Sequence, residues 1–366
     1  MSGSSVLGGS RTTDSTGRAG VTAWVLGRTA GENALTVTAA TLSASVTATA
    51  VAGPVSVAHT QLTVAAGDTV PAGTTTAITL RTYDQYANPL TVGGLSIAFV
   101  LSGGTSTGKL TPVLDNGDGS YQAKLTGIGA GTALTVGATV DGSALTSPLP
   151  TITVVAGAPA RLDLAAGDGQ EATVGTAVPV APTVSLSDAM GNPIAGAVVT
   201  FEVTGGGGSL SGGTQVTDPA GRAGVRAWTL GPTGGENLLT AVVQALRATF
   251  AATAVPGPAS PTASLVVVSQ DTVAVGGSVN VLLRAYDAFG NPARSGGATV
   301  TFYLKGGTSG GTFAQTIDRG DGTYVAAFTA VTPGTPSYVR ALVGDVEAIT
   351  PSPTLTVRGA GTRWKQ

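Results

Sequence analysis

Side chains that commonly carry catalysis or bind metals are scarce in this sequence. Its 366 residues include one histidine, His59, and no cysteine. A histidine-activated nucleophile would have only His59 to draw on, and a zinc site needs several nitrogen or sulfur ligands. We therefore expect no catalytic residue, no metal ligand and no cofactor, and nothing in the sequence indicates an enzyme.

Acidic residues form pairs in two related turns. Asp115 and Asp118 share one turn, and Asp318 and Asp321 share the other, within the pattern Asp-x-Gly-Asp-Gly. Calcium prefers about six to eight oxygen ligands, more than one such turn supplies. A glycosidase needs two carboxylates facing each other across a cleft, and the acids here are few and lie mostly in turns. We expect these carboxylates to bond to the backbone of their own turns.

The tripeptide Arg319-Gly-Asp321 is of the type that integrins recognise. The related turn has Asn116-Gly-Asp118 at the same place. The turn alone accounts for the glycine and the aspartate, so we expect a structural turn rather than a receptor site.

Glycine clusters at 205–208 and 306–311 are not followed by the Gly-Lys-Ser/Thr of a phosphate-binding loop. They come after strand-like segments, which predicts loops between strands. Trp24 and Trp228 occupy equivalent positions in a repeat described below. An exposed tryptophan could stack on a sugar, but one repeated in a strand is more often a packing residue.

A turn followed by an alternating strand occurs three times. The turns cover residues 84–90 (DQYANPL), 188–194 (DAMGNPI) and 287–293 (DAFGNPA). Proline disfavours helical geometry at the preceding asparagine, glycine permits a positive φ, and aspartate can bond to the backbone two residues on. Ala87 replaces the glycine of the other two turns. If that position is left-handed, alanine costs about 1 kcal/mol there.

The strands after these turns are predicted at 95–101, 196–203 and 298–304. Apolar and polar residues alternate in each, which is typical of a strand with one face on a core. The predicted inward residues are Ile97, Phe99, Leu101, Val199, Phe201, Val203, Val300, Phe302 and Leu304.

Composition favours an all-β protein with many turns. The 55 glycines and 20 prolines are spread along the chain and are too many for a helical protein. Charged residues make up 10%, against about 25% in a typical domain, and the net charge is −2. Without a basic stripe, nucleic acid and anionic membrane are not expected partners. No apolar run approaches the roughly 20 residues of a membrane span, and the first residues lack the regions of a signal peptide.

The sequence repeats itself. Residues 14–27 (DSTGRAGVTAWVLG) match residues 218–231 (DPAGRAGVRAWTLG) at an offset of 204, and this offset holds as far as Gly53-Pro54. Beyond that point the offset becomes 203, as Tyr83-Asp84 and Tyr286-Asp287 show. Two kinds of unit, named A and B here, therefore alternate.

We predict five segments from this alignment. They are the second half of an A unit at 1–52, a B unit at 53–157, a complete A unit at 158–256, a second B unit at 257–358, and a tail at 359–366 that could begin a further repeat. The joints are a few residues of Gly, Pro, Ala or Ser, too short for a flexible tether. We expect units stacked end to end as a rod, each about 35–45 Å long.

The A unit resembles the bacterial Ig-like domain of the Big-1 type found in invasin and intimin-like surface proteins. Residues 188–196, 199–201, 217–224, 228–231 and 235–241 carry the resemblance. The B unit is similar to a filamin-type Ig repeat within the invasin and intimin superfamily, on residues 318–329, 334–335 and 353–357. The resemblance implies tandem β-sandwiches of about seven strands, in surface proteins whose adhesive activity usually belongs to a terminal domain absent here.

Our leading hypothesis is a non-catalytic stalk segment of an extracellular adhesin-like protein on a bacterial surface. Its partners would be neighbouring Ig-like repeats, with a host or surface receptor bound through the absent tip. A second hypothesis is a filament subunit whose half-unit is completed by strands of a neighbouring chain. The half-unit lacks about three strands and the tail could offer one, which favours truncation. A third is a glycan-binding or phage-virion module. The half-unit should expose an apolar face around Val21, Trp24, Leu35 and Val46.

Overall fold

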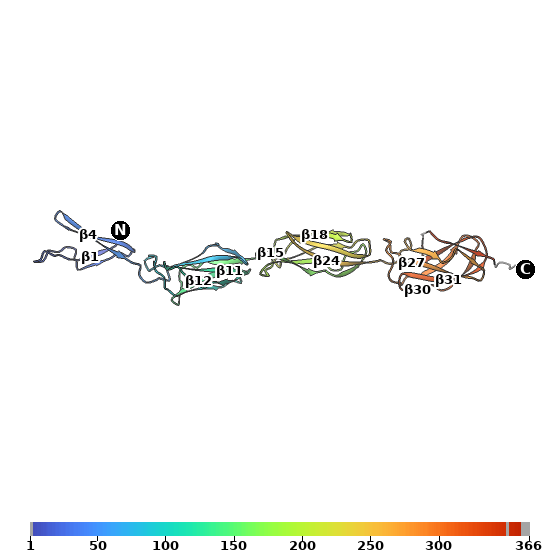
Figure 1. Cartoon of the computed structure of the whole chain (residues 1–366), viewed down its shortest axis with the longest axis horizontal. Coiled ribbons are helices and arrows are strands. Elements are labelled where there is room, and N and C mark those ends of the chain that lie inside the picture. Colours follow the sequence, from blue (N-terminus) through green and yellow to red (C-terminus); the bar gives the residue numbers. More distant parts are fainter. Residues whose placement is uncertain (1–2, 349–350, 360–366) are drawn as a thin grey trace. The chain divides into compact units, whose positions relative to one another are not determined.

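A computed structural model describes residues 3–348 and 351–359 of the chain. All regular elements of these residues are strands, numbered β1 to β34 (Figure 1), as the predicted all-β class requires. The chain divides into two compact regions, whose bounds differ from those of the A and B units. The first comprises residues 1–160 with 187–194, and the second comprises 161–186 with 195–366. The predicted tail after residue 359 lies outside the described residues.

The half-unit at 1–52 forms two pairs of strands. β1 (Ser5–Leu7) pairs with β2 (Ala23–Val25), and β3 (Gly31–Ala39) pairs with β4 (Leu42–Ala50) as an antiparallel hairpin. In Figure 1 the tip of this hairpin stands apart from β1. No described strand extends the hairpin on either edge.

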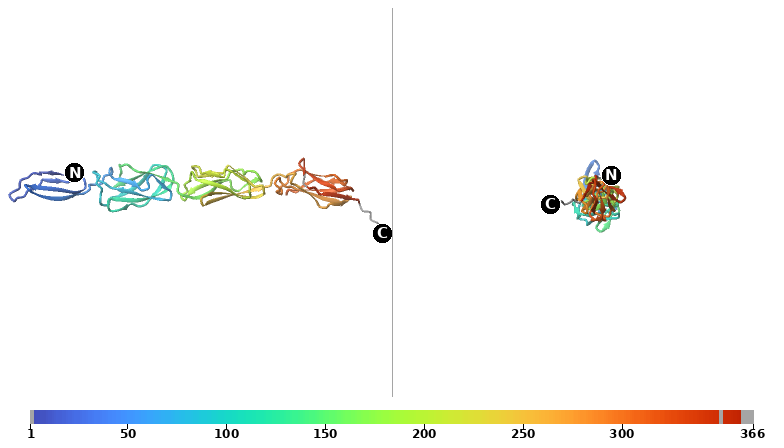
Figure 2. Two further views of the ribbon diagram at one scale, coloured as in Figure 1. Left: turned by 90° about the horizontal axis from the view of Figure 1, so that it is seen from above. Right: turned by 90° about the vertical axis from the view of Figure 1, so that its right-hand side faces the viewer.

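Residues 53–157 form two five-stranded sheets. In the first sheet the order is β10 (Leu114–Asp115), β11 (Ser120–Gly129), β7 (Thr75–Arg81) and β5 (Gln61–Val64), with β9 (Thr107–Leu110) also on β11. In the second it is β13 (Ser143–Ala144), β12 (Leu134–Val140), β14 (Thr151–Val155) and β6 (Thr69–Pro71), with β8 (Ile97–Ser102) also on β12. One core takes Ile78, Leu80 and Leu125 from the first sheet and Val136 and Ile152 from the second. Figure 2 shows the two layers in a second view.

Residues 158–256 contain a five-stranded sheet and two smaller ones. The large sheet has the order β16 (Gln170–Thr173), β24 (Leu246–Val255), β23 (Gly235–Val243), β18 (Val198–Gly205) and β20 (Thr214–Val216). The smaller sheets are β15 (Pro159–Ala166), β17 (Thr183–Asp188) and β21 (Arg222–Gly224), and the pair β19 (Ser209–Ser211) and β22 (Ala227–Thr229). Trp228, Leu239 and Phe250 are fully buried.

Residues 257–358 repeat the sheets of residues 53–157. One sheet has the order β25 (Leu265–Val268), β27 (Ser278–Arg284), β31 (Thr323–Thr332) and β29 (Gly310–Phe313), with β30 (Ile317–Asp318) also on β31. The other has β26 (Thr272–Ala274), β34 (Thr354–Arg358), β32 (Ser337–Val343) and β28 (Val300–Lys305), with β33 (Val346–Glu347) also on β32. Both sheets contribute to a single core that includes Leu283, Phe328 and Leu355.

The three strands predicted after the repeated turns are β8, β18 and β28, and their inward residues are as predicted. Val199, Phe201, Val300 and Phe302 are buried. The inward residues of β8 are half-buried and alternate with exposed ones. Period-2 alternation is a local property, which is why the sequence alone reveals it.

The backbone at Ala87 is left-handed, as its place in the repeated turn suggests. Its φ is 62°, against 85° at Gly191 and 83° at Gly290. An L-residue with a Cβ is strained in this region and glycine is not. The turn at 84–90 therefore stores strain that the other two turns avoid.

We expect Ala87→Gly to raise the free energy of unfolding of residues 53–157 by about 0.5–1 kcal/mol, because relief of the backbone strain exceeds the extra chain entropy of glycine. Gly290→Ala is the reciprocal control. No atom lies within 4 Å of a Cβ built there, so the loss of stability should come from the backbone alone. Calorimetry of each full-length variant measures both effects, and a destabilised Ala87→Gly would contradict the strain argument.

Candidate functional site

His59 lies on the surface of the first B unit. It is exposed, and its Nδ1 lies 3.1 Å from the hydroxyl of Ser56. The neighbouring surface pocket is lined by residues 54–58, Gln85, Val140, Asp141 and Ser143, with Asp141 as its acidic residue. Within the part of the chain that the structure describes, no group of three or more His, Cys, Asp or Glu residues could hold a metal ion.

The paired aspartates are bonded to the backbone around them, as predicted. Asp115 accepts N–H groups of Gly94 and Gly117, at 2.7 and 2.8 Å. Asp118 accepts the N–H and the hydroxyl of Ser120, at 2.9 and 2.6 Å. These bonds from Ser120 lower the pKa of Asp118 below its usual value. The carboxylates therefore act as turn acceptors.

The second aspartate pair has the same arrangement. Asp318 accepts N–H groups of Gly297 and Gly320. Asp321, the last residue of the Arg-Gly-Asp tripeptide, accepts the N–H and the hydroxyl of Thr323, at 2.9 and 2.5 Å. The turn thus accounts for this aspartate too.

The equivalent tryptophans differ in burial. Trp228 is fully buried in the complete A unit, which confirms the packing role, while Trp24 in the half-unit is only half-buried. The glycine clusters lie in or beside loops between strands, as predicted. Gly206–Gly208 connect β18 to β19, and residues 306–309 connect β28 to β29.

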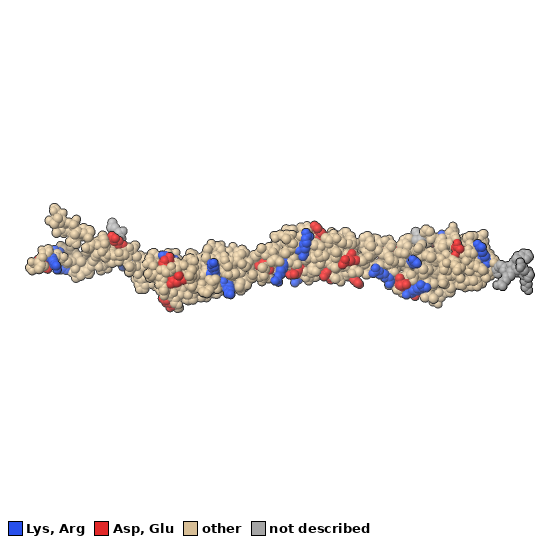
Figure 3. All heavy atoms as spheres, viewed as in Figure 1, with Lys and Arg blue, Asp and Glu red and all other residues tan. Residues whose placement is uncertain are grey.

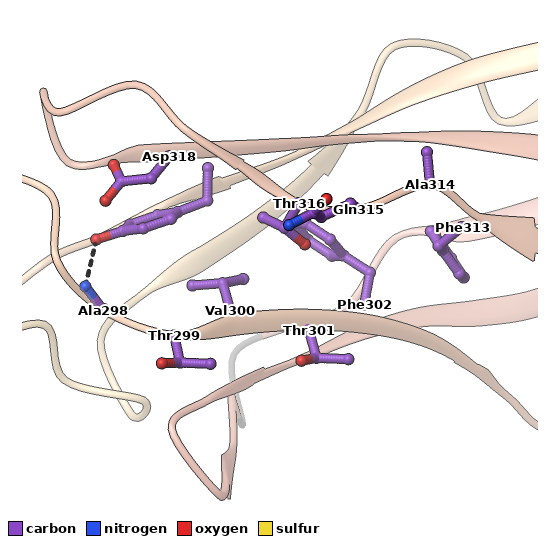
Figure 4. A pocket seen from close by; sticks show the side chains of 11 residues that line it. Ala298, Thr299, Val300, Thr301, Phe302, Phe313, Ala314, Gln315, Thr316 and Asp318 are labelled. Carbon is purple, nitrogen blue, oxygen red and sulfur yellow. Dashed lines mark hydrogen bonds between the residues drawn. The ribbon is translucent and has the colours of Figure 1, made fainter.

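A pocket of about 460 Å³ lies beside β28 (Figure 4). Phe302 and Phe313 line it, with ring centroids 6.1 Å apart. The Tyr324 hydroxyl accepts the N–H of Ala298 at 3.0 Å, and the one acidic residue of the lining, Asp318, is bonded as described above. Tyr324 and Asp318 thus use their oxygens to hold backbone N–H groups of the fold.

The residues that share one geometry at three places are those of the repeated turns. We call residues 84–89, 188–193 and 287–292 the junction turns. Each begins with a buried aspartate, with exposed fractions of 2%, 1% and 1% for Asp84, Asp188 and Asp287. One carboxylate oxygen accepts two N–H groups of its own turn, at 2.8–2.9 Å. The aspartate thus fixes the turn.

The other carboxylate oxygen holds the linker that precedes the unit. Asp84 accepts the N–H of Gly53 at 2.9 Å. Asp188 accepts that of Gly157 at 2.8 Å, and Asp287 that of Gly257 at 3.0 Å. Each of these glycines lies about 30 residues before its aspartate, at a predicted joint. The linkers are therefore bonded to the turns and are not free tethers.

The asparagine of each junction turn reaches the preceding segment. Its Nδ2 donates both to the turn aspartate and to a backbone carbonyl of that segment, and its Oδ1 accepts an N–H two residues beyond that carbonyl. Asn88 binds the Arg28 carbonyl at 2.7 Å and the Ala30 N–H at 2.8 Å. The other two turns repeat this pair of contacts. Asn192 binds Ile128 and Ala130, and Asn291 binds Pro232 and Gly234, at 2.8–2.9 Å.

The third residue of each junction turn also faces the preceding segment. The Tyr86 ring lies 5.2 Å from the Arg28 guanidinium carbon. A Cβ built on Gly175 would lie 2.8 Å from the Phe289 ring, so glycine there makes room for that ring. Met190 lies in the same way beside Gly73, 3.8 Å from a Cβ built there. A contact of the third side chain therefore accompanies the hydrogen bonds of each turn, a cation–π contact at Tyr86 and an apolar one at Met190 and Phe289.

Sequence analysis found the junction turns but not their contacts with the preceding segment. A signal was present: Asp and Asn recur four residues apart in all three copies, although turn geometry alone does not require both side chains.

The loop of the second B unit that corresponds to residues 128–131 lacks one backbone N–H group. At the offset of 203, Ile128 and Ala130 correspond to Val331 and Pro333. Gly131 and Gly334, one residue on, make the same bond, to the carbonyls of Val154 and Val357 respectively. Proline has no N–H. This loop can therefore offer the asparagine of a junction turn the Val331 carbonyl, but no N–H group two residues on.

Hydrogen bonding keeps the junction aspartates ionised despite their burial. Burial opposes ionisation of Asp84, but bonds from the Asn88 side chain and from the N–H groups of Gly53, Asn88 and Tyr86 outweigh it and lower its pKa to about 2. The pKa values of Asp188 and Asp287 are lowered by the same kinds of bond.

A lowered folded-state pKa predicts acid sensitivity. The stabilisation by Asp84 is fully present above its unfolded pKa of about 4 and is lost as the pH falls towards its folded pKa of about 2, a change of about 2 kcal/mol. Thermal unfolding of the full chain between pH 5 and pH 2 should show this loss for residues 53–157. Asp84→Asn, which cannot ionise, should flatten the dependence of stability on pH. If the slope of stability against pH stays unchanged in this variant, the assignment of the acid sensitivity to Asp84 is contradicted.

The surface is poor in charge. On the face shown in Figure 3, Lys, Arg, Asp and Glu are scattered among residues of other types. Among the described residues, no helix has the length and hydropathy needed to cross a membrane.

Comparison with solved structures finds several similar bacterial proteins. The chain is similar to FdeC, an adhesin of Escherichia coli, at 26% identity over 84% of this chain and 100% of that chain, with a TM-score of 0.46. It is similar to invasin, a bacterial integrin-binding protein, at 20% identity, with a TM-score of 0.40, over 82% of this chain and 60% of that chain. InvD of Yersinia pseudotuberculosis matches at 18% identity over 81% and 96% of the two chains, with a TM-score of 0.42. No curated protein sequence matches significantly.

A family model, "Invasin, domain 3", matches residues 55–157 and 260–358. These are the two B units, whose resemblance to the invasin and intimin superfamily is thereby confirmed, while the likeness to filamin repeats stays a prediction. The two matches cover more than half of the chain. The chain therefore belongs to the invasin domain 3 family, among the bacterial Ig-like domains of the invasin and intimin type.

Proposed function

We propose that this chain is a non-catalytic, stiff spacer of an adhesin-like protein on a bacterial surface. The observation that carries the proposal is the threefold recurrence of the junction turn, with the same aspartate-to-linker and asparagine-to-loop bonds each time. Membership of a family named after invasin supports the extracellular setting. A receptor would be bound by a further domain of the whole protein, and the units here would carry that domain away from the cell.

Stiffness follows from the number of constraints at each joint. A linker of a few residues limits the separation of two domains but not their orientation. Each junction turn adds three bonds, one to the linker and two to the preceding loop, and the contact of its third side chain beside them. The side-chain amide of each asparagine binds two backbone groups of the preceding loop that lie two residues apart. Because both bonds are directional, the loop cannot rotate about the amide without breaking one of them. The turns therefore resist both bending and twisting.

The test is the distance between two spin labels on either side of one joint. The chain has no cysteine, so labels at Arg247→Cys and Asp345→Cys, both exposed, are unique. We expect a narrow distance distribution in the otherwise unchanged chain and a clearly broader one after Asn291→Ala. Asn280→Ala, an exposed asparagine of the same segment, should leave the distribution narrow.

Two results would contradict the proposal in different ways. A broad distribution in the otherwise unchanged chain would remove the spacer function. If the distance distribution stays narrow in Asn291→Ala, the spacer function would still be supported, but its stiffness would have to come from contacts other than the junction turns.

A further inference from the structure

The β3–β4 hairpin of the half-unit exposes the face that its counterpart buries. Val37 and Val46 are 56% and 55% exposed, while the equivalent Ala241 and Phe250 of the complete A unit are both fully buried. The offset of 204 relates each strand of the half-unit to one of the complete unit, so β1, β2, β3 and β4 correspond to β19, β22, β23 and β24. Of the residues around which an exposed apolar face was predicted, Val21 and Val46 are exposed, while Trp24 and Leu35 are half-buried.

The half-unit already has the local structure of a complete unit. Asn33 is buried, and its Oδ1 accepts the N–H of Gly27 at 3.0 Å. Asn237 makes the equivalent bond to Gly231 at 2.9 Å. Residues 10–12 and 18–20, which correspond to β20 and β21, form no strand. The four strands that are present pair as their counterparts do, so a binding partner would meet a partly formed surface.

The complete unit shows which strands flank such a hairpin in the sheet. There β18 pairs antiparallel with β23, and β16 pairs parallel with β24. In the half-unit the corresponding edges of β3 and β4 have no described partner strand. Unpaired edges beside exposed apolar residues favour strand addition.

We propose that this face binds a polypeptide segment that carries the first half of an A unit, of which residues 158–205 are the example within this chain. Such a segment supplies both the antiparallel partner of β3 and the parallel partner of β4. A second copy of the hairpin, paired about a twofold axis, would bring antiparallel strands only. The inference goes beyond the spacer function and does not depend on it.

The register of the complex follows from the complete unit. Thr200 lies opposite Val242, and Phe201 opposite Ala241. Subtracting the offset places residue 200 of the segment opposite Thr38 and residue 201 opposite Val37. Residue 201 of the segment would then lie beside the exposed Val37, on the same face of the extended sheet.

The experiment adds a separate polypeptide of residues 158–205 to the full chain and measures binding by isothermal titration. We expect saturable binding of one polypeptide per chain. Val46→Asp, a change at an exposed residue that should not prevent folding, should weaken binding at least tenfold. Ser43→Asp should not, because the equivalent Arg247 is exposed in the complete unit. Residues 260–305, the first half of a B unit, serve as the control polypeptide.

Disulfide formation tests the register. With Thr200→Cys in the added polypeptide, a cross-link should form with a chain carrying Thr38→Cys and not with one carrying Thr36→Cys. The inference is overturned if residues 158–205 bind no better than residues 260–305, if Val46→Asp has no effect, or if the cross-link ignores the register. It is also overturned if the chain pairs with itself through the hairpin and the polypeptide does not compete.

Discussion

Asp287→Ala is expected to lower the free energy of unfolding of residues 257–358 by about 3–5 kcal/mol. The Asp287 carboxylate is 1% exposed, and it accepts N–H groups of Gly257, Phe289 and Asn291 and the side-chain amide of Asn291. Alanine leaves these donors without their acceptor in a place that water reaches poorly, and each orphaned donor costs about 1–3 kcal/mol.

This loss is large because a domain of about 100 residues has only about 5–15 kcal/mol of stability. Hydrogen exchange followed by mass spectrometry on the full chain locates it, since peptides from 257–358 should lose protection while peptides from 53–157 keep it. Asp271→Ala is the matched control, because Asp271 is exposed in the same segment. A loss below about 1 kcal/mol would mean that the junction turn holds its shape without its carboxylate.

The second large effect is expected at Trp228. Trp228→Ala should cost about 3–5 kcal/mol, because the side chain is fully buried and its removal leaves a cavity. The half-unit provides the control at the same repeat position. Trp24 is only half-buried, so Trp24→Ala should cost much less, about 1 kcal/mol. Urea unfolding of each full-length variant compares the two positions.

Trp228→Phe separates packing from hydrogen bonding. The Trp228 Nε1 is buried without a hydrogen-bond partner among the described residues. Phenylalanine removes that unsatisfied donor and keeps much of the apolar volume, so it should cost clearly less than alanine. Equal costs for phenylalanine and alanine would show that the indole makes contacts that a smaller ring cannot replace.

The sequence was sufficient for features that depend on neighbours along the chain. Alternation predicted β8, β18 and β28, and the comparison of three turns identified Ala87 as the residue that would be strained if its backbone were left-handed, which it is. Self-alignment at offsets of 204 and 203 predicted that Trp24 and Trp228 are equivalent. The alignment alone could not predict that Trp228 is fully buried while Trp24 is only half-buried, because burial depends on the strands that cover each position.

The contacts of the junction turns with the preceding segment could not be predicted from the sequence for a different reason. Asn88, Asn192 and Asn291 bind residues about 60 positions away along the chain, and they bind backbone groups. A carbonyl and an N–H are present at almost every residue, so the receiving loop carries no side-chain signature. Arg28, Ile128 and Pro232 accept equivalent bonds although their side chains have little in common.

Pro333 gives the far end of the second B unit a distinct mechanical character. A junction turn that docks on this loop finds the Val331 carbonyl but no N–H two residues on. It would gain one bond from its asparagine where the other three turns gain two, a difference of about 1 kcal/mol. Under a pulling or shearing force, such a joint would yield before its neighbours. In a series of such joints, this imino acid would mark the one held by a single asparagine bond.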